Sequence, residues 1–416
     1  MIKLLIVQKY GGSSVSDAEC IKRVAKRITN SFSQGNKLVV VLSAQGDTTD
    51  DLTKKAMELN KNAGRRELDM LLTTGEQQSV ALMAMAIHDL GYPAISLTAP
   101  QVGIHATSNY GNARIKNISK SRMSSELDRN NIVLVAGFQG LNRYGDVTTL
   151  GRGASDTTAV AIAAVLHADL CEIYSDVKGV YTADPQIVEN AVKINEISYD
   201  EMLELASQGV QVLHNRAVEM AKRYRVKLVV RSSFCEDEGT LVKEEVPGME
   251  KLYVSGIAVD DNISRISVVG VVDKPGMAYK LFSLLDKKKI SVDIILQSIG
   301  RNNTKDISFT VHKDRLEEAL EAIESSKNVL NFDHISHDED IAKLSIVGAG
   351  MASNHGVASM MFEALYDCGV NIDMISTSEI KISVLIDKTN VKRAMNTVHD
   401  KFINSQIELY KGAAQI

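Results

Sequence analysis

Glycines, hydroxyl side chains and charges of both signs are concentrated in residues 137–158, GFQGLNRYGDVTTLGRGASDTT, which run directly into an alanine-rich helix pattern. The start of a helix presents unpaired backbone N–H groups and a partial positive charge, both of which favour an anion. Ser155 is predicted to cap this helix, and Arg152 carries a guanidinium suited to a carboxylate or phosphate. A capping serine alone would be structural, but two glycines together with Arg152 and Asp156 favour a binding site for a small charged molecule.

A second glycine turn, KYGGSS (9–14), follows the first predicted strand and precedes a helix. The backbone N–H groups of Gly11 and Gly12 suit phosphate oxygens, and Lys9 suits the neutralisation of transferred charge. The spacing is not that of a Walker A loop, and a glycine pair after a strand is by itself more often only a turn.

Polar side chains also lie in three further loops, SAQGDTTDDL (43–52), TTGEQQS (73–79) and YSDVKGVYTADP (174–185). Ser43 and Thr49 are predicted at the carboxyl edge of the sheet, where open α/β sheets bind ligands. Glu76 is placed to accept a substrate ammonium group, Asp176 to meet magnesium or a nucleotide, and Tyr181 to stack on a base. Each loop taken alone is equally explained by helix capping or Asx turns.

The composition excludes several classes of protein. A length of 416 residues allows two or three domains, and 44% hydrophobic with 24% charged residues is typical of a soluble globular protein. A net charge of −5 without a basic block argues against nucleic-acid binding. The four cysteines form no CxxC pair, which favours free thiols in a cytoplasmic protein over disulfides or zinc. The apolar start MIKLLIVQKYGG is too short to span a membrane or to act as a signal peptide.

Apolar β-branched runs alternate with helix patterns over residues 3–233, which predicts a mostly parallel sheet covered by helices on both faces. The predicted strands are 3–7, 37–43, 94–98, 132–138, 170–175 and 227–233. The predicted helices are 17–33, 50–60, 70–90, 112–129, 156–167, 199–207 and 215–224. Ser16 to Glu19 has the form of a capping box, and the acidic stretch 235–251 is the predicted domain boundary.

An internal repeat lies beyond this boundary, since residues 266–298 align with 344–378 and place Gly276 opposite Gly356 and Asp293 opposite Asp373. Each copy continues into a strand and an amphipathic helix, at 306–311 with 314–326 and at 381–386 with 390–402. The order β-α-β-β-α-β predicts two ferredoxin-like units. Such small sheets leave open edges, so pairing between copies or chains is expected.

Taken in order, these segments resemble the aspartate kinases (aspartokinases) over nearly the whole chain. The matching segments are VQKYGGSSV (7–15), VVVLSAQGDTTDDL (39–52), TTGEQQS (73–79), GFQG with TTLGRGASDTTA (137–159), YSDVKGVYTADP (174–185) and TSEIKISVLID (377–387). The resemblance implies a three-layer α/β/α amino-acid-kinase domain of carbamate-kinase-like type at 1–245. It also implies two ferredoxin-like ACT domains, the first (263–335) inserted in the second (250–262 and 336–416). A further catalytic domain is absent from the pattern, as in monofunctional members.

The resemblance implies that ATP, with Mg²⁺, phosphorylates the β-carboxylate of L-aspartate to 4-phospho-L-aspartate, the first step towards lysine, threonine and methionine. An aspartate carboxylate is already ionised at neutral pH, so this reaction needs no general base. The implied catalytic residues are Lys9, Arg152 and Asp156. Those implied around aspartate are Ser43, Thr49, Glu76, Phe138, Arg152, Ser155 and Asp156. Those implied around ATP are Lys9, Tyr10, Gly11, Gly12, Ser175, Asp176, Tyr181 and Asp184, and no residue is assigned as a direct metal ligand.

Three positions depart from the family pattern. Ala154 stands where glycine is usual, Gln186 where arginine is common and Gln211 where lysine is often found. The loss of two cations near a polyphosphate is expected to weaken ATP binding or slow transfer, unless Lys178 or Arg216 compensates.

The ACT pair implies feedback inhibition by lysine, threonine or both, and a homodimer or tetramer formed through these domains. The implied effector-binding residues are Asp273, Gly276, Met277, Ala278, Asp293 and Gln297, with Ser376, Ser378 and Glu379 from the second copy. A strand-to-helix turn suits the carboxylate of an amino acid, and an acidic residue suits a cationic side chain.

Two alternatives remain open from the sequence. One is a kinase of the same fold that acts on another amino-acid carboxylate, of the glutamate type. The other is a catalytically weak amino-acid sensor, which the departures at Gln186 and Gln211 make plausible.

Overall fold

The computed structural model describes residues 3–210, 212–244, 253–298, 303–352 and 354–404, and the chain forms two compact units. The first unit comprises residues 1–181, 193–207 and 211–249. The second comprises residues 182–192, 208–210 and 250–416. The segment 182–192 therefore leaves the first unit and returns to it, which differs from the undivided domain expected at 1–245.

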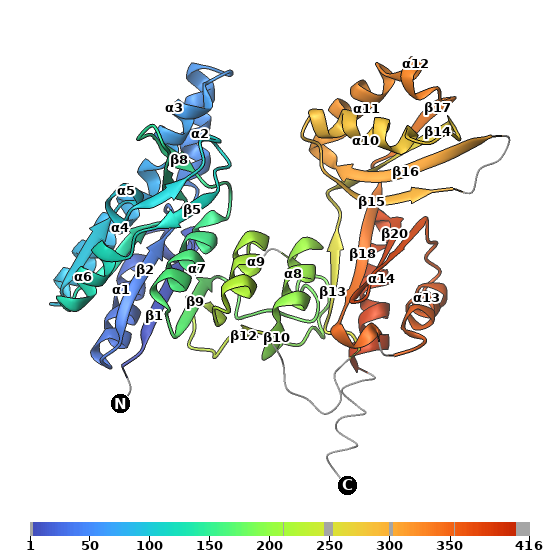
Figure 1. Cartoon of the computed structure of the whole chain (residues 1–416). Coiled ribbons are helices and arrows are strands. Elements are labelled where there is room, and N and C mark those ends of the chain that lie inside the picture. Colours follow the sequence, from blue (N-terminus) through green and yellow to red (C-terminus); the bar gives the residue numbers. More distant parts are fainter. Residues whose placement is uncertain (1–2, 211, 245–252, 299–302, 353, 405–416) are drawn as a thin grey trace, which may run out of the picture. The chain divides into compact units, whose positions relative to one another are not determined.

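An eight-stranded, mostly parallel sheet forms the centre of the first unit, as the sequence predicts (Figure 1). Its strands, in spatial order, are β10 (Glu196–Ser198), β12 (Thr240–Lys243), β11 (Leu228–Ser232), β9 (Leu170–Ser175), β1 (Leu5–Tyr10), β2 (Lys37–Leu42), β6 (Ile132–Ala136) and β3 (Ala94–Leu97). Only the β11–β12 pair is antiparallel within this sheet. The central strands are buried on both faces, because their sequences are continuous apolar runs without polar alternation.

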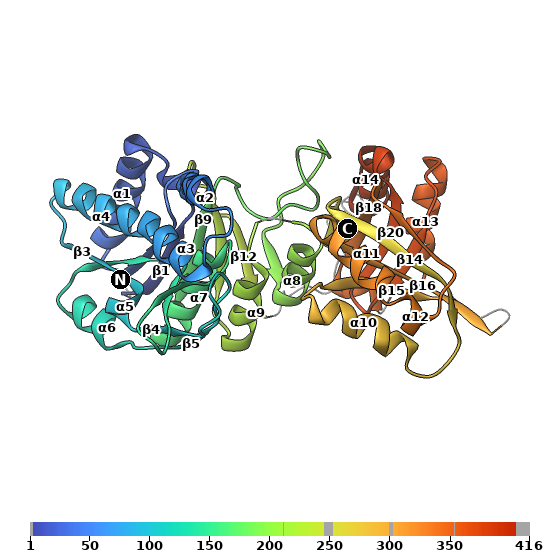
Figure 2. The same ribbon diagram turned by 90° about the horizontal axis from the view of Figure 1, so that it is seen from above.

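Helices cover both faces of this sheet. On one face α1 (Ala18–Ser33) packs beside α4 (Thr74–Asp89), as Figure 2 shows, over a core of alternate strand residues. On the other face α7 (Ala154–Leu166) packs against β1, β2 and β9, and its alanines allow close approach. The other α-helices described in the first unit are α2 (Thr48–Leu59), α3 (Arg65–Leu72), α5 (Ala99–Val102), α6 (Ser121–Asp128), α8 (Tyr199–Ser207) and α9 (Asn215–Tyr224).

A second, small sheet corrects one prediction. Its strands, in spatial order, are β5 (Ile115–Ile118), β4 (Ile104–Ala106), β7 (Gln139–Leu141) and β8 (Val147–Thr149). The helix predicted over 112–129 was wrong, because its first half is β5 and only α6 is helical. Residues Ile115 to Ile118 pair with β4 instead, so tertiary pairing overrides the local helix pattern.

The capping box predicted at Ser16 to Glu19 was also wrong by one residue. The N-cap of α1 is Asp17, whose carboxylate accepts a hydrogen bond from the backbone N–H of Cys20 at 2.8 Å. This bond lowers the pKa of Asp17, because it stabilises the charged carboxylate.

The second unit contains two antiparallel four-stranded sheets that follow the internal repeat. The first lobe comprises β14 (Ile263–Val272), α10 (Met277–Lys287), β15 (Val292–Gln297), β16 (Thr304–His312), α11 (Leu316–Glu324), α12 (Lys327–Leu330) and β17 (His334–Asp338). The second lobe comprises β13 (Gly256–Asp260), β18 (Ile341–Val347), α13 (Val357–Asp367), β19 (Met374–Thr377), β20 (Lys381–Asp387) and α14 (Val391–His399). The strand orders β15-β16-β14-β17 and β19-β20-β18-β13 correspond, so β13 occupies in the second lobe the place that β17 has in the first.

Reciprocal ion pairs join the two lobes. Arg265 lies on β14 and Lys343 on the equivalent strand β18. Each pairs with the aspartate near the start of β15 or β19 in the other lobe. Lys343, only 2% exposed, binds Asp293, whereas Arg265 lies 3.5 Å from Asp373. An apolar seam lies between them, formed by Ile263, Ile294, Ile341, Met374 and Leu385. The internal repeat thus makes an interface with pseudo-twofold character.

The segment 182–192 packs into the core of the second lobe through Ala183 and Val188. The hydroxyl group of Thr182 lies 2.9 Å from Nε2 of the buried His399, and Asn396 donates to the backbone oxygen of Ile187 at 3.1 Å. Burial lowers the pKa of His399. Within the described residues no helix is long and apolar enough to cross a bilayer.

Candidate functional site

Lys9 and Asp156 form an ion pair where β1 ends and α7 begins. The ammonium of Lys9 lies 2.8 Å from Oδ1 of Asp156, and the two side chains are 12% and 9% exposed. Lys9 faces α7 because strand alternation sends Gln8 and Tyr10 to the opposite face. Asp156, in the first turn of α7, also meets the positive end of the helix dipole. The structure therefore brings together two of the three residues predicted as catalytic.

The KYGG turn approaches the loop after β2 with no room for a side chain. A Cβ atom on Gly12 would lie 2.8 Å from the backbone oxygen of Ala44, and the N–H of Gly46 donates to the oxygen of Gly12 at 3.1 Å. The N–H of Gly11 donates to the oxygen of Tyr174 at 3.1 Å. The turn is thereby fixed between β2 and β9, at the carboxyl edge of the sheet.

Glu76 is a buried carboxylate at the start of α4 and is only 3% exposed. Its Oε1 accepts the backbone N–H of Ala44 at 3.3 Å, but its Oε2 has no hydrogen-bond partner among the residues described. Burial raises its pKa to about 7, because the charged form loses hydration. A buried acid with one free oxygen is suited to a cationic group of a ligand.

The start of α7 differs from its prediction. Ser155 was predicted to cap this helix, but the N-cap is Gly153, which has a left-handed φ of 71°, and no side chain caps the helix. Ser155 lies inside the first turn, packed so closely against Gly137 that a Cβ there would lie 2.6 Å from its Oγ. Ala154 is the first helical residue and is not among the residues with positive φ, so the position that is usually glycine does not require a left-handed backbone here.

Phe138, predicted beside aspartate, adopts a left-handed conformation with φ of 66° and is 8% exposed. Its N–H donates to the hydroxyl group of Thr158 at 3.3 Å, and its oxygen accepts the N–H of Leu150 at 2.9 Å. A bulky residue in this conformation is strained, and such strain is common at functional sites.

Arg152 is 83% exposed, and its guanidinium lies 2.8 Å from Oδ1 of Asp50 in the first turn of α2. Thr49 lies in that same turn and is half-buried, and Ser43 donates its backbone N–H to Tyr10 at 3.1 Å. The residues predicted around aspartate thus lie after the ends of β2 and β6 and at or just before the starts of α2, α4 and α7.

His214 was missed by the sequence analysis. Its backbone N–H lies 3.4 Å from Oδ2 of Asp156, and its ring packs against Gly153, where a Cβ would lie 2.7 Å from Cδ2. Its Nδ1 accepts the N–H of Arg216 at 3.2 Å, and burial lowers its pKa. The sequence signal near it is Gln211, which stands three residues before His214 and departs from the family pattern.

Arg216, considered as a compensating cation, binds backbone oxygens instead. Its guanidinium donates to Leu150 at 2.6 Å and to Ala113 at 3.1 Å, and so ties α9 to the loop before Gly151. Lys178 lies 3.7 Å from Asp237 and is 59% exposed. Gln211 lies outside the described residues.

The residues predicted around the nucleotide follow β9. Ser175 is the last residue of this strand, Asp176 is exposed, and Tyr181 is half-buried and forms a β-bridge with Lys193. Asp184 belongs to the second unit, where its carboxylate accepts the N–H of Gln186 at 2.8 Å. Among the described residues no group of three or more His, Cys, Asp or Glu side chains could hold a metal ion.

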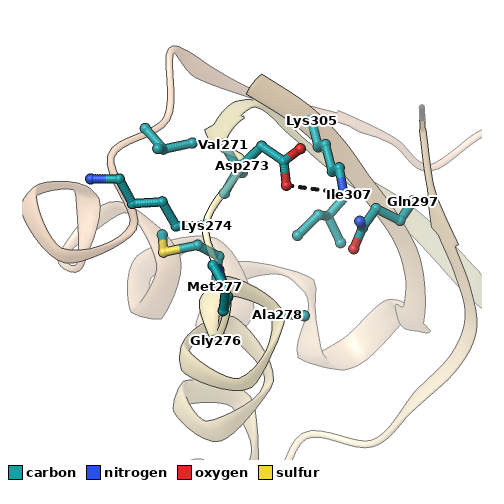
Figure 3. Close-up of a pocket in the computed structure, with 11 residues that line it drawn as sticks. Val271, Asp273, Lys274, Gly276, Met277, Ala278, Gln297, Lys305 and Ile307 are labelled. Atoms are coloured by element: carbon teal, nitrogen blue, oxygen red, sulfur yellow. Dashed lines mark ion pairs between the residues drawn. The ribbon is translucent and has the colours of Figure 1, made fainter. Parts of the chain in front are cut away.

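A pocket of about 340 Å³ opens at the strand-to-helix turn of the first lobe (Figure 3). It is lined by Val271–Ala278, Gln297, Lys305 and Ile307. Asp273 and Lys305 form an ion pair of 3.0 Å across it, and Gly276 begins α10 with φ of 89°. Five predicted effector residues, Asp273, Gly276, Met277, Ala278 and Gln297, are therefore brought together.

The other predicted effector residues lie elsewhere. Asp293 is absent from the lining, because its carboxylate pairs with Lys343 of the second lobe. Ser376 is half-buried on β19, whereas Ser378 and Glu379 are exposed in the turn before β20.

Comparison with known families and proteins places these features in context. Residues 4–232 match the amino acid kinase family, and residues 266–326 and 344–402 match the ACT domain. The aspartokinase of Bacillus sp. (strain MGA3) is 48% identical over 398 residues, covering 96% of this chain and 97% of that protein. The aspartokinase of Corynebacterium glutamicum is 48% identical over 404 residues, covering 96% of each chain. The Helicobacter pylori (strain 26695) aspartokinase is 49% identical over 400 residues, covering 95% of this chain and 98% of that protein.

The similar solved structures include aspartate kinases. Aspartate kinase from Synechocystis is 43% identical with a TM-score of 0.55, covering 96% of this chain and 69% of that one. E. coli aspartokinase III with aspartate and ADP has a TM-score of 0.81 at 23% identity, covering 95% of this chain and 99% of that one. The same enzyme with lysine and aspartate has a TM-score of 0.75 at 22% identity, covering 96% and 99%. These two structures establish the shared fold.

Gly75→Ala tests the packing that positions Glu76. The new Cβ would lie 2.8 Å from Cβ of Ala44 and 3.4 Å from Cγ2 of Thr48. Such overpacking destabilises by about 1–3 kcal/mol, so thermal unfolding is expected at a lower temperature. The double variant Gly75→Ala/Ala44→Gly removes the closest contact and is expected to recover most of the loss. A single variant as stable as the unmodified protein would show that this contact is wrong.

Proposed function

Since the chain belongs to the amino acid kinase family and is an aspartate kinase, we propose that it transfers the γ-phosphate of ATP to the β-carboxylate of L-aspartate. The observation that carries this reaction is the Lys9–Asp156 ion pair at the meeting point of the glycine turn and the start of α7. It supplies a fixed cation between the proposed nucleotide loops and the proposed aspartate residues.

The reaction requires little covalent chemistry from the protein. A β-carboxylate oxygen attacks the γ-phosphorus, and the bond from that phosphorus to the bridging oxygen breaks. ADP leaves with the bond's electron pair, and no proton moves. Catalysis is then positioning and charge neutralisation, a role for which Lys9 is suited because Asp156 fixes its ammonium. His214, the N-cap residue of α9, contacts Asp156 and Gly153 and so acts as a positioning residue.

On the aspartate side, the free oxygen of buried Glu76 is suited to the substrate ammonium group. Arg152 is suited to a substrate carboxylate. Its exposed ion pair with Asp50 is of a kind worth about 1 kcal/mol or less, so a ligand can replace Asp50 easily. Ser43, Thr49, Phe138 and Ser155 complete the proposed surroundings.

On the nucleotide side, the N–H of Gly12 is proposed to bind phosphate oxygens, beside Ser175, Asp176 and Tyr181. Gly11 and Tyr10 are proposed to shape this turn, because the N–H of Gly11 is bonded to the oxygen of Tyr174 and the side chain of Tyr10 is buried on the opposite face of the sheet. Asp184 is proposed from the family pattern alone. Mg²⁺ would enter with ATP, since this ion is commonly held by substrate phosphates and one or two carboxylates. The donor set fits this mode of binding, because Asp176 is exposed beside the strand end. The ion would neutralise phosphate charge.

We further propose that the pocket of the first lobe binds the carboxylate and amino groups of a feedback effector, lysine or threonine. The start of α10 suits the carboxylate, and Asp273 or Gln297 suits the amino group. Asp293, Ser376, Ser378 and Glu379 remain proposals from the family pattern. Ile295 and Leu296 are exposed on the edge strand β15, which supports assembly of copies through this lobe.

An ATP-dependent hydroxamate assay with aspartate and glutamate in parallel tests the substrate. Aspartate is expected to be the preferred substrate, because the family relation covers 96% of the chain. Preference for glutamate would favour a kinase of another amino acid. Binding of lysine without formation of phospho-aspartate would favour the sensor.

Lys9→Met is expected to lower kcat by about 10²–10³-fold, the usual cost of removing one preorganised group that stabilises transferred charge. Lys37→Met is the matched control, because Lys37 forms an exposed ion pair with Asp128 at the start of β2. Circular dichroism checks that both variants fold. Near-normal turnover by Lys9→Met would contradict the assigned role.

Binding of aspartate is expected to weaken as the pH falls through about 7. Glu76 binds an ammonium group only when ionised, and its pKa in the free protein is raised to about 7. Calorimetric titration with aspartate in the absence of ATP isolates this group, because the substrate does not titrate near neutral pH. Glu76→Gln is expected to bind about tenfold or more weakly, with a flat pH profile. A steep profile in Glu76→Gln would assign the titration to another group.

Inhibition of wild-type activity by lysine, threonine and both together tests the effector. Ala278→Trp is expected to fill the pocket mouth, abolishing inhibition while leaving kcat within about twofold, since surface changes remote from a site usually have small effects. Ala278 lines the pocket at the first turn of α10. Unchanged inhibition in this variant would place the effector elsewhere.

A further inference from the structure

A buried polar cluster lies beneath the proposed nucleotide loops, on the face of the sheet opposite Lys9. Its members are Gln8 and Tyr10 of β1 and Glu172 and Tyr174 of β9, which are 1%, 0%, 6% and 4% exposed. Gln8 is the register partner of Glu172, and Tyr10 is the register partner of Tyr174. The four side chains therefore form two adjacent pairs on one face. None of them is available to a substrate from solvent.

Glu172 is the acceptor at the centre of this cluster. Its Oε2 accepts from the amide of Gln8 at 2.8 Å and from the hydroxyl group of Tyr174 at 3.1 Å, and its Oε1 lies 3.5 Å from Nε of Arg231. The hydroxyl group of Tyr10 donates in turn to Gln8 at 3.2 Å. Burial raises the pKa of both tyrosines, so they remain donors at any working pH.

The two tyrosine rings hold the strand ends together. They stack with centroids 4.6 Å apart and an angle of 6° between their planes. Arg27 of α1 lies 5.1 Å from the ring centroid of Tyr174 and donates to the backbone oxygens of Ser232 and Cys235 at 2.8 and 2.7 Å. The cluster thus joins the carboxyl ends of β1, β9 and β11.

Each tyrosine immediately precedes a proposed nucleotide loop. Tyr10 is followed by Gly11 and Gly12, and Tyr174 by Ser175 and Asp176. The N–H of Gly11 donates to the oxygen of Tyr174, so any shift between the two strands moves the glycine turn. Lys9 lies between Gln8 and Tyr10 in the sequence, so the same strand fixes its ammonium on the other face.

Stability alone does not account for a carboxylate at this place. A buried charge must be dehydrated, and well-packed apolar side chains of similar volume are often equally or more stabilising. The neighbouring strands β2 and β6 present only apolar residues to this face. The carboxylate instead lies on β9, which leads into a proposed nucleotide loop, and its cationic neighbour Arg231 lies on the adjacent strand β11, which indicates a geometric requirement at these strand ends.

We propose that Glu172, with Gln8, Tyr10 and Tyr174, is a positioning residue that holds the ends of β1 and β9 at the spacing that nucleotide phosphates require. This inference rests on the proposed phosphoryl transfer and concerns only the nucleotide side. A disturbed cluster is therefore expected to weaken nucleotide binding and slow transfer, while binding of aspartate is preserved.

Glu172→Gln keeps the side-chain volume and removes the charge. The dissociation constant of MgADP, measured by calorimetry, and the KM for MgATP are each expected to rise about tenfold, the equivalent of one hydrogen bond to a charged group. The dissociation constant of aspartate is expected to stay within about twofold. Tyr174→Phe, which removes one hydroxyl group and keeps the ring stack, is expected to give a smaller change in the same direction. If Glu172→Gln does not fold, the same measurements on Tyr174→Phe decide the proposal.

Glu126→Gln is the matched control, because Glu126 is another carboxylate of this unit that is only 2% exposed. It lies on α6, accepts from Asn131 at 2.9 Å and so sits before the start of β6, at the amino edge of the sheet. This variant is expected to lose stability without a change in nucleotide affinity. The exchange Gln8→Glu/Glu172→Gln returns the carboxylate to the cluster and is expected to recover most of the affinity.

The proposal fails if Glu172→Gln lowers the unfolding temperature as Glu126→Gln does and leaves MgADP affinity unchanged. It also fails if aspartate and nucleotide affinities fall together, since that would indicate a general structural role. Wild-type protein that binds MgADP but phosphorylates neither aspartate nor glutamate would overturn the proposed function. The MgADP measurements would still decide the role of Glu172.

Discussion

The proximity of a largely enclosed cation and a buried carboxylate is the constraint on which the catalytic unit depends. Lys9 and Asp156 come from β1 and from the start of α7, which are remote in sequence, and at 2.8 Å they require both elements to be correctly placed. The alanine-rich surface of α7 lets the helix lie close to β1, and the left-handed Gly153 turns the chain into it. Neither residue is stable when buried without the other, so the ion pair selects one packing of helix on sheet.

The three charged groups of the proposed substrate region differ in how well the protein satisfies them. Lys9 has a close, buried partner, so its position is fixed before any ligand arrives. Glu76 has one oxygen that accepts a hydrogen bond and one without a partner among the described residues. The loss of hydration on burial destabilises its charged form, and a cationic ligand can offset that cost. Arg152 has a partner at the surface, where water competes with the ion pair. A fixed group suits transferred charge, whereas the incompletely satisfied and exposed groups suit recognition of a substrate.

The sequence predicted those features that depend on local patterns. The buried parallel strands, the repeat and the polar residues at strand ends were all recognisable, because periodicity and glycine turns act over a few residues. It failed where tertiary pairing decides, since β5 pairs with β4 in place of a helix. The capping error is local, because Ser16 and Asp17 are both good N-cap residues and the structure uses Asp17. His214 could not be identified because its link to Asp156 spans 58 residues. The pairing of Asp293 with Lys343 was hidden for the same reason, although the repeat relates the two ion pairs of that interface.

The chain passes from the first unit into the second and back again through the segment 182–192. After Tyr181 the backbone enters the second unit, buries Ala183 and Val188 in the core of its second lobe, and returns at Lys193. Tyr181 and Lys193 form a β-bridge at the point of departure and return. A rearrangement of that lobe that displaced the segment 182–192 would act on the first unit at Tyr181 and Lys193, where the segment leaves and returns. Because interfaces of packed side chains shift between discrete arrangements, such a connection can convert a change of lobe packing into a change of loop position.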